Sequence, residues 1–154
     1  MKSLITLVAF LASLALALAG CGSSLEVIHG SPSPTPTDFA GLTQKLANHN
    51  LVVDKVVSGD AGCTDQGLAP MAISFTIAGI GEAVPLPARL YTFRNDASYT
   101  KLRATVDTCA AEWVKDPASL LMIDASPYVL VMEGAKDQAF IDALRTSLHE
   151  AAGN

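Results

Sequence analysis

The feature that most limits what this chain can fold into is an apolar run at its N-terminus. The fifteen residues from Leu4 to Leu18 include only Thr6 and Ser13 as polar interruptions, and they follow a single positive charge at Lys2. A membrane-spanning helix needs about 20 apolar residues to cross ~30 Å of hydrocarbon, so this run is short for a span. A charged start, an apolar run and small residues before a cleavage point are typical of an export signal. We therefore expect residues 1–20 to be removed and the fold to be built from the rest of the chain.

The apolar run ends in the tetrapeptide Leu18-Ala19-Gly20-Cys21. It resembles the lipobox of bacterial lipoproteins, in which a branched residue and two small residues precede a cysteine. The resemblance implies that the bond between Gly20 and Cys21 is cleaved, that the Cys21 sulfur carries a diacylglycerol, and that the new N-terminus is often acylated too. Two or three acyl chains anchor a protein stably, so the lipid would hold it at a cell membrane or outer membrane, with its domain outside the cytoplasm. A plain export signal with a chance cysteine is the alternative.

Two further cysteines, Cys63 and Cys109, remain when Cys21 carries a lipid. Exported proteins meet an oxidising environment in many bacteria, so we expect a single disulfide between these two. It would close a loop of 46 residues, for which the loss of chain entropy in the unfolded state predicts about 4 kcal/mol of stabilisation. The alternatives are two buried thiols or a metal pair, although a metal would normally recruit close-spaced Cys or His partners, which neither cysteine has.

Residues 21–37 are expected to form the lipid-bearing cysteine and a tether. Pro32, Pro34 and Pro36 alternate there with serine and threonine, which favours an extended, polyproline-like chain. Sixteen such residues reach roughly 50 Å when fully extended. The tether also contains His29, which we interpret as solvated. The domain can therefore stand clear of the lipid headgroups.

The net charge and the motifs of the sequence limit the classes of function that this chain can have. Without residues 1–20 the chain has nine Lys and Arg against fifteen Asp and Glu, a formal charge of −6, and it has no positive cluster, which argues against nucleic acid as a partner. The sequence lacks the nucleophile elbow, the phosphate loop, the dinucleotide fingerprint and the zinc-protease motif. His49 and His149 lie near helix ends, where we interpret them as solvated. Asp60 and Asp65 flank Cys63 and could hold a cation, but they lack the acidic spacing of a calcium loop.

We therefore expect no cofactor, no metal and no catalytic residue, and we interpret the protein as a non-enzymatic binding or interaction module of the cell envelope. Its partner would be a protein, a cell-wall component or a small ligand. The alternative is an envelope enzyme, such as a hydrolase, with a site that the sequence does not reveal. Trp113, the only tryptophan, is interpreted as buried in the core.

Residues 38–154 are expected to fold as one α+β domain. Periodicity predicts helices over 38–48, from Asn95 or Asp96 toward Pro117, and after Asp137. Each helix is expected to turn one apolar stripe to the core: Phe39, Leu42 and Leu46; Tyr99, Leu102, Val106, Cys109, Ala110 and Trp113; and Phe140, Ile141, Leu144 and Leu148. It predicts strands over 51–58, 71–77, 88–94 and 127–133. The order is α-β-β-β-α-β-α, and we expect a two-layer sandwich with a four-stranded mixed sheet and helices mainly on one face, in the style of ferredoxin-like folds. The aromatic strand Leu90-Tyr91-Thr92-Phe93 and the apolar strand Val129 to Gly134 also resemble small uncharacterised bacterial lipoprotein domains.

The strand at 127–133 is apolar on both of its sides. If helices cover only one face of the sheet, this strand presents either Tyr128, Leu130 and Met132 or Val129 and Val131 to the open face. An apolar strip on a polar sheet face is typical of a contact surface, although the tether or the loop 79–87 folding over it would bury it. We expect a partner to bind on this open face.

Overall fold

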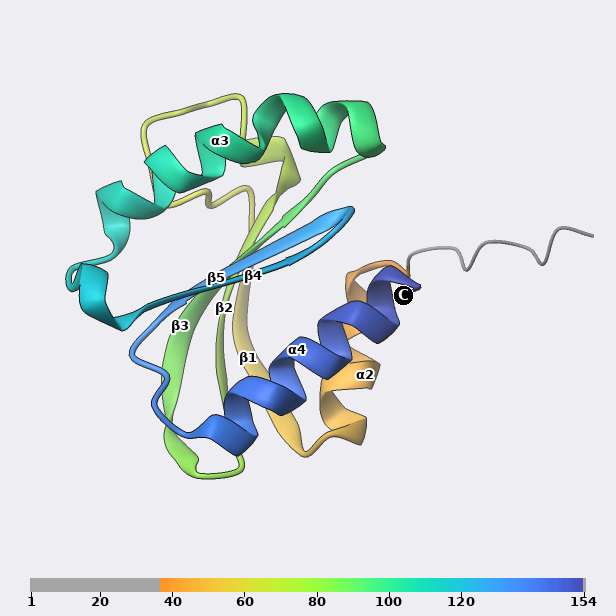
Figure 1. Ribbon diagram of the computed structural model, residues 1–154, viewed down its shortest axis with the longest axis vertical. Coiled ribbons are helices and arrows are strands. Elements are labelled where there is room, and N and C mark those ends of the chain that lie inside the picture. The colour runs from red at the N-terminus through yellow and green to blue at the C-terminus, as the bar shows by residue number, and fades with distance from the viewer. Residues whose placement is uncertain (1–36, 154) are drawn as a thin grey trace, which may run out of the picture. The chain divides into compact units, whose positions relative to one another are not determined.

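The computed structural model describes residues 37–153, so the expected cleavage and lipidation positions, Gly20 and Cys21, lie outside the described part of the chain. The helices are α2 (Phe39–Asn48), α3 (Asp96–Trp113) and α4 (Gln138–Ala152). The strands are β1 (Leu51–Ser58), β2 (Ala72–Gly79), β3 (Glu82–Thr92), β4 (Leu120–Ala125) and β5 (Tyr128–Glu133). Short 3-10 turns cover Ala69–Met71 and Pro117–Ser119. The α+β class is confirmed, but the sheet has five strands instead of four because Leu120–Ala125 forms the additional strand β4 (Figure 1).

The strand order is β1-β2-β3-β5-β4, and every neighbouring pair is antiparallel. The expected mixed sheet, with the strand before α3 running parallel to the strand at 127–133, is therefore wrong. The missed strand explains the error, because β4 and β5 are joined by the short turn at Ser126–Pro127 and a short turn reverses the chain. Since β3 and β4 are both antiparallel to β5, they run parallel to each other with β5 between them. The crossover through α3 thus connects β3 to β4, not to β5.

The helices cover both faces of the sheet, so the expected two-layer arrangement with helices mainly on one face needs correction. α2 and α4 pack on one face against Phe75, Leu90 and Leu130. α3 and the segment before β2 pack on the opposite face against Tyr91 and Val129. In Figure 1 the twisted sheet separates α3 from the pair α2 and α4.

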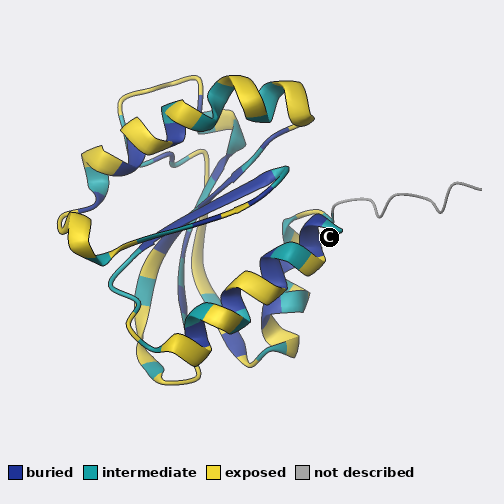
Figure 2. Cartoon of the chain, viewed as in Figure 1, coloured by how far each residue is buried: buried dark blue, intermediate teal, exposed yellow. Residues whose placement is uncertain are grey.

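β5 is the most buried strand, with side chains in both cores. Tyr128, Leu130 and Met132 face α2 and α4, whereas Val129 and Val131 face α3, and all five are buried (Figure 2). The hypothesis that this strand presents an apolar strip to an open sheet face is therefore wrong, because α3 covers the side that was expected to be open. Three of the six exposed large apolar side chains of the described residues lie instead on the edge strand β1: Val52, Val56 and Val57.

The helix boundaries follow the caps that the sequence predicts. Asp38 accepts a hydrogen bond from the backbone N–H of Gly41, and Asp137 accepts one from Phe140. Asn95 caps α3 by accepting a hydrogen bond from Ser98 N. The predicted inward stripes are also confirmed, because each helix turns its apolar positions to one of the two cores: Leu42 and Leu46 in α2; Tyr99, Leu102, Val106, Cys109, Ala110 and Trp113 in α3; Phe140, Ile141, Leu144 and Leu148 in α4.

β3 begins earlier than expected, at Glu82, although Pro85 and Pro87 interrupt its sequence. Proline is confined to edges of sheets because it cannot donate to a strand ladder. β5 pairs only with residues 88–92 of β3, so residues 82–87 have a neighbour on one side alone and form a local edge. The two prolines are tolerated at this local edge. They are also the reason that the sequence predicts a strand start at residue 88 instead of at Glu82.

The chain enters the domain beside the end of α4. Thr37 donates its backbone N–H to the carbonyl of Ala151 at 2.8 Å, and its own carbonyl accepts a hydrogen bond from the Tyr128 hydroxyl. The first described residue is thereby tied both to the last turn of α4 and to the interior strand β5.

Candidate functional site

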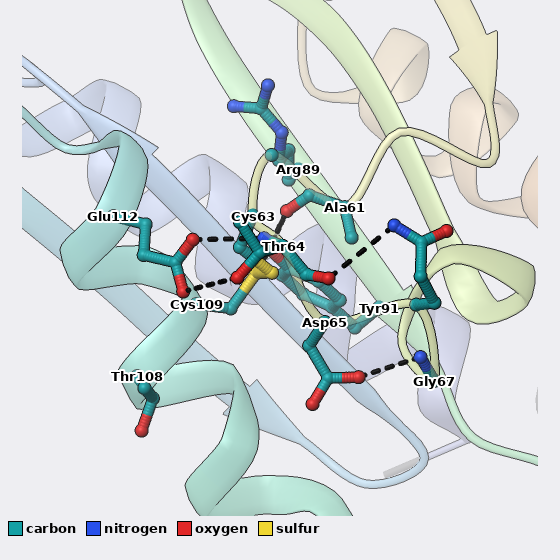
Figure 3. Close-up of a disulfide and its surroundings, with 12 residues drawn as sticks. Ala61, Cys63, Thr64, Asp65, Gly67, Arg89, Tyr91, Thr108, Cys109 and Glu112 are labelled. Carbon is teal, nitrogen blue, oxygen red and sulfur yellow. Dashed lines mark hydrogen bonds between the residues drawn. A yellow bond between two sulfur atoms is a disulfide. The ribbon is translucent and has the colours of Figure 1, made fainter.

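Residues 59–71 connect β1 to β2, and we call this segment the stapled loop. Its Cys63 forms a disulfide with Cys109 of α3, with the two Cα atoms 5.1 Å apart. The predicted disulfide is confirmed, and Cys109 lies on the inward stripe of its helix as expected. Figure 3 shows the disulfide between the loop and the helix. The disulfide therefore holds the irregular stapled loop against the helix α3.

Hydrogen bonds fix the stapled loop on both sides of the disulfide. The Tyr91 hydroxyl, fully buried in β3, donates to the carbonyl of Ala61 at 2.8 Å. On the exposed side, the Glu112 carboxylate of α3 accepts hydrogen bonds from the backbone N–H of Thr64 at 2.9 Å and from its hydroxyl at 3.4 Å (Figure 3). Burial raises the pKa of Tyr91, so this tyrosine stays a neutral donor. The loop is therefore held by a covalent bond, a buried hydroxyl and an exposed carboxylate.

Beneath the loop, Arg89 of β3 lies between an acid and an aromatic ring. Its Nη2 lies 3.2 Å from Asp60 Oδ2, and its guanidinium carbon lies 4.4 Å from the ring centre of Trp113. Burial opposes ionisation of Asp60, but hydrogen bonds from Ser74 and Gly62 together with the charge of Arg89 hold the pKa of Asp60 below its usual value. Trp113 was predicted to be buried in the core, and it packs against the core but is only partly buried. It also forms a cation–π contact that the sequence does not reveal.

Glycine is required at position 62 because these side chains crowd it. A Cβ atom there would lie 2.4 Å from Arg89 Nε and 2.8 Å from Trp113 Cδ1, and the residue has a φ of +76°. Both Arg89 Nε and Trp113 Nε1 are buried with no hydrogen-bond partner among the described residues. The loop backbone therefore closes directly over two nitrogen donors.

Three hollows border the stapled loop. The acidic hollow, of about 340 Å³, is lined by residues 59–64 with Gln66, Ala69 and Glu112; its charged side chains are Asp60 and Glu112, both carboxylates. The apolar hollow, of about 580 Å³, has Phe39, Pro70, Met71 and Ile73 among its lining and shares Gly59 and Ala69 with the acidic hollow. A third hollow, of about 500 Å³, lies between Met71 and the start of α3 at Asn95 and Ser98. Concave surfaces thus gather around one loop.

The candidate cation ligands of the loop are already engaged. Asp65 accepts a hydrogen bond from the backbone N–H of Gly67 at 2.7 Å, and Asp60 pairs with Arg89. Among residues 37–153 no group of three or more His, Cys, Asp or Glu side chains is placed to hold a metal ion. Of the histidines, His29 lies outside the described residues, His49 lies 3.3 Å from Glu150, and His149 belongs to the last turn of α4.

A second polar cluster fastens α3 to the edge strand β4. Arg103 pairs with Asp124 of β4 and with Asp107 one turn further along α3, and the Tyr99 hydroxyl donates to Asp124 at 2.9 Å. The hydrogen bond with Asp124 raises the pKa of Arg103. Burial opposes ionisation of Asp124, but hydrogen bonds from Arg103 and Tyr99 lower the pKa of Asp124 overall. The i, i+4 spacing of Tyr99, Arg103 and Asp107 is visible in the sequence, but no local pattern signals their partner Asp124 on β4.

The fold and site define a class of small α+β domain: an antiparallel five-stranded sheet with helices on both faces and a disulfide-stapled loop beside three hollows. Comparison with protein-family models, curated proteins and solved structures gives no significant match for this chain. Within residues 37–153 none of the helices combines the length and apolar character needed to cross a bilayer.

Proposed function

We propose that this protein is an exported lipoprotein, anchored through lipid on Cys21, whose domain binds an envelope partner through the stapled loop without catalysing a reaction. The lipobox-like residues Leu18 to Cys21 support the anchor. The disulfide between Cys63 and Cys109 supports export, since such bonds persist mainly in oxidising compartments.

The observation that carries the binding role is the gathering of three hollows around one rigidly held loop. Binding residues are found disproportionately on loops positioned by a rigid scaffold, and ligand sites are concave. Here a disulfide and the Glu112–Thr64 hydrogen bonds position the loop in advance, so a partner would not have to order it on binding.

The lining of the hollows indicates the chemistry of the partner. The charged groups of the acidic hollow are carboxylates, and the adjoining apolar hollow offers Phe39, Met71 and Ile73 with Asp38 as its charged residue. A partner that presents a basic group beside an apolar group, as in a basic segment of another envelope protein, complements both hollows.

The anchor is tested by metabolic labelling with an alkyne fatty acid. We expect the wild type to be labelled and Cys21→Ser to be unlabelled. Equal labelling of both proteins would exclude lipidation at this residue.

The binding site is tested in living cells with a photo-crosslinking amino acid at Gln66, an exposed residue that lines the acidic hollow. The matched control carries the same amino acid at Thr146, an exposed position on α4. We expect a defined crosslinked species from position 66 alone, weakened by Glu112→Gln, which removes a charge but retains an acceptor for Thr64, and unaffected by Asp116→Asn. Equal crosslinking from both positions would contradict the proposed site.

A further inference from the structure

Pairs of a serine or threonine followed by proline are concentrated in one short part of this chain. Of its eight prolines, three follow a hydroxyl-bearing residue within the run Ser31-Pro32-Ser33-Pro34-Thr35-Pro36, and Ser126-Pro127 is the other such pair. The run lies just before the described residues, and the proposed function uses it only as a spacer. A spacer needs length and solubility, but it does not need a hydroxyl group at every second position.

Alternation with proline favours hydroxyl groups that an enzyme can reach. Proline has no backbone N–H and a fixed φ, so a chain with proline at every second position cannot continue a helix or the interior of a sheet. Each proline also restricts the residue before it to extended conformations. Serine- and threonine-rich segments that contain proline are typical of stalks that carry O-linked sugars.

The spacing of these hydroxyl groups suits a bulky modification. A polyproline helix has three residues per turn and rises ~3.1 Å per residue. Hydroxyl groups at every second position of such a helix would lie about 6 Å apart along its axis and about 120° apart around it. Sugars on Ser31, Ser33 and Thr35 would therefore project in three different directions and would not collide.

The structure indicates where the series of acceptors ends. Thr37, the next residue at the same spacing, donates its hydroxyl to the carbonyl of Asp38 at 3.0 Å and its backbone N–H to the carbonyl of Ala151. The Thr37 side chain also packs beside Gly41, where an added Cβ atom would lie only 2.6 Å from the Thr37 Cβ. Because the Thr37 hydroxyl already has a partner at the start of the domain, we place the last acceptor at Thr35.

Ser126 provides a contrast within the domain. It also precedes a proline, but its hydroxyl donates to the Asp96 carboxylate at the start of α3, at a distance of 3.0 Å. It belongs to the short turn that joins the paired strands β4 and β5. A transferase would have to break this hydrogen bond and open the turn, so we expect Ser126 to stay unmodified.

We propose that Ser31, Ser33 and Thr35 are O-glycosylated after export, which makes residues 31–36 a sugar-bearing stalk. This inference rests on the export part of the proposed function and not on its binding site. The donor is a sugar linked to a polyprenyl phosphate. The hydroxyl oxygen forms a bond to the anomeric carbon of the sugar, and the bond from that carbon to the phosphate oxygen breaks. Polyprenyl phosphate leaves, and the hydroxyl proton passes to a base of the transferase.

Mass spectrometry of the full-length protein, purified from the cells that naturally make it, tests the proposal. No Lys or Arg lies between Cys21 and Lys45, so a single tryptic peptide carries the three acceptors together with Thr37. We expect this peptide to be heavier by whole sugar residues. Fragmentation that preserves side-chain modifications should place the sugars on the three acceptors and not on Thr37.

Alanine variants supply the controls. Ser31→Ala/Ser33→Ala/Thr35→Ala should lose all of the added sugar mass, whereas Ser126→Ala should keep it. A cleaved chain without sugar, or one with sugar only at other positions, would overturn the proposal. A chain that still carries residues 1–20 would overturn the export proposal and this one with it, so the two failures are distinguishable.

Proline variants test why these hydroxyl groups are chosen. Pro32→Ala/Pro34→Ala/Pro36→Ala keeps all three hydroxyl groups but removes the restriction that proline places on the backbone. We expect the fraction of chains that carry sugar to fall in this variant. An unchanged fraction would contradict the argument from alternation with proline.

Discussion

The guanidinium of Arg89 lies over the ring of Trp113, 4.4 Å from its centre, and the backbone of Gly62 closes directly on both. This contact joins β3, α3 and the stapled loop at one point. This crowding explains why the residue before Cys63 is a glycine.

Gly62→Ala should be strongly destabilising, because the new Cβ would collide with Arg89 and Trp113 at a positive φ. We expect the free energy of unfolding to fall by about 3 kcal/mol, of which about 1–2 kcal/mol is the cost of a left-handed backbone for alanine. Gly59→Ala is the matched control, since its φ is +84° but nothing lies within 4 Å of its Cβ position. Urea unfolding of both variants measures the difference; equal losses would show that the packing around Gly62 is not tight.

Removing the disulfide should cost stability without unfolding the sheet. Cys63 and Cys109 are 46 positions apart in the sequence. We expect the Cys63→Ala/Cys109→Ala variant to lose about 4 kcal/mol, because the unfolded chain regains the entropy of an open loop. Urea unfolding with and without reductant checks this. Reductant should destabilise the wild type and leave the double variant unchanged, and a wild type indifferent to reductant would contradict the bridge.

Tyr91 should make the protein sensitive to high pH. Its hydroxyl ionises near pH 10 in an unfolded chain, and burial raises its pKa in the folded protein. The unfolded state therefore releases its proton first, so stability is full below about pH 10 and is lost as pH rises toward the folded pKa. We expect Tyr91→Phe to lose about 1 kcal/mol at pH 7 from the missing hydrogen bond. Between pH 9 and 11 its free energy of unfolding should decline less steeply than that of the wild type, and parallel declines would contradict the assignment.

The turn between β2 and β3 contains a strained residue, Ile80, whose replacement should increase the stability of the protein. Ile80 and Gly81 both have positive φ, 31° and 40°, a conformation that suits Asn-Gly and strains a β-branched residue. Ile80→Asn should therefore stabilise the protein by about 0.5–1 kcal/mol, measured by thermal unfolding. Ile80→Val keeps the β-branch and should give no gain; if the asparagine variant is no more stable than the valine variant, the strain is absent.

Local patterns in this sequence predict its helices well, because capping residues and apolar spacing act within a few residues of each other. Asp38, Asn95 and Asp137 begin the helices as expected, and Cys109 faces the core at the predicted position. The disulfide could also be predicted, because only two cysteines were left to pair once the N-terminal one was assigned to lipid.

The topology could not be predicted in the same way, because it depends on one short strand. Leu120–Ala125 is an edge strand that follows a 3-10 turn, and its partial burial produces no clear alternation. Without β4, the chain after α3 would enter β5 directly and give β5 the direction that β4 in fact has. The contact of Arg89 with Asp60 and Trp113 joins residues 29 and 24 positions apart, so no local spacing signals it.

The attachment of Thr37 has a mechanical consequence. A pull on the chain from its N-terminal side reaches Tyr128 and the last turn of α4, so the load enters the sheet at the interior strand β5 and not at an edge strand. If the domain were pulled open, the covalent link between residues 63 and 109 would bypass the 46-residue separation between them, which withholds roughly 160 Å of extended chain. The stapled loop would then keep its connection to α3 under tension that separates the strands on either side of it.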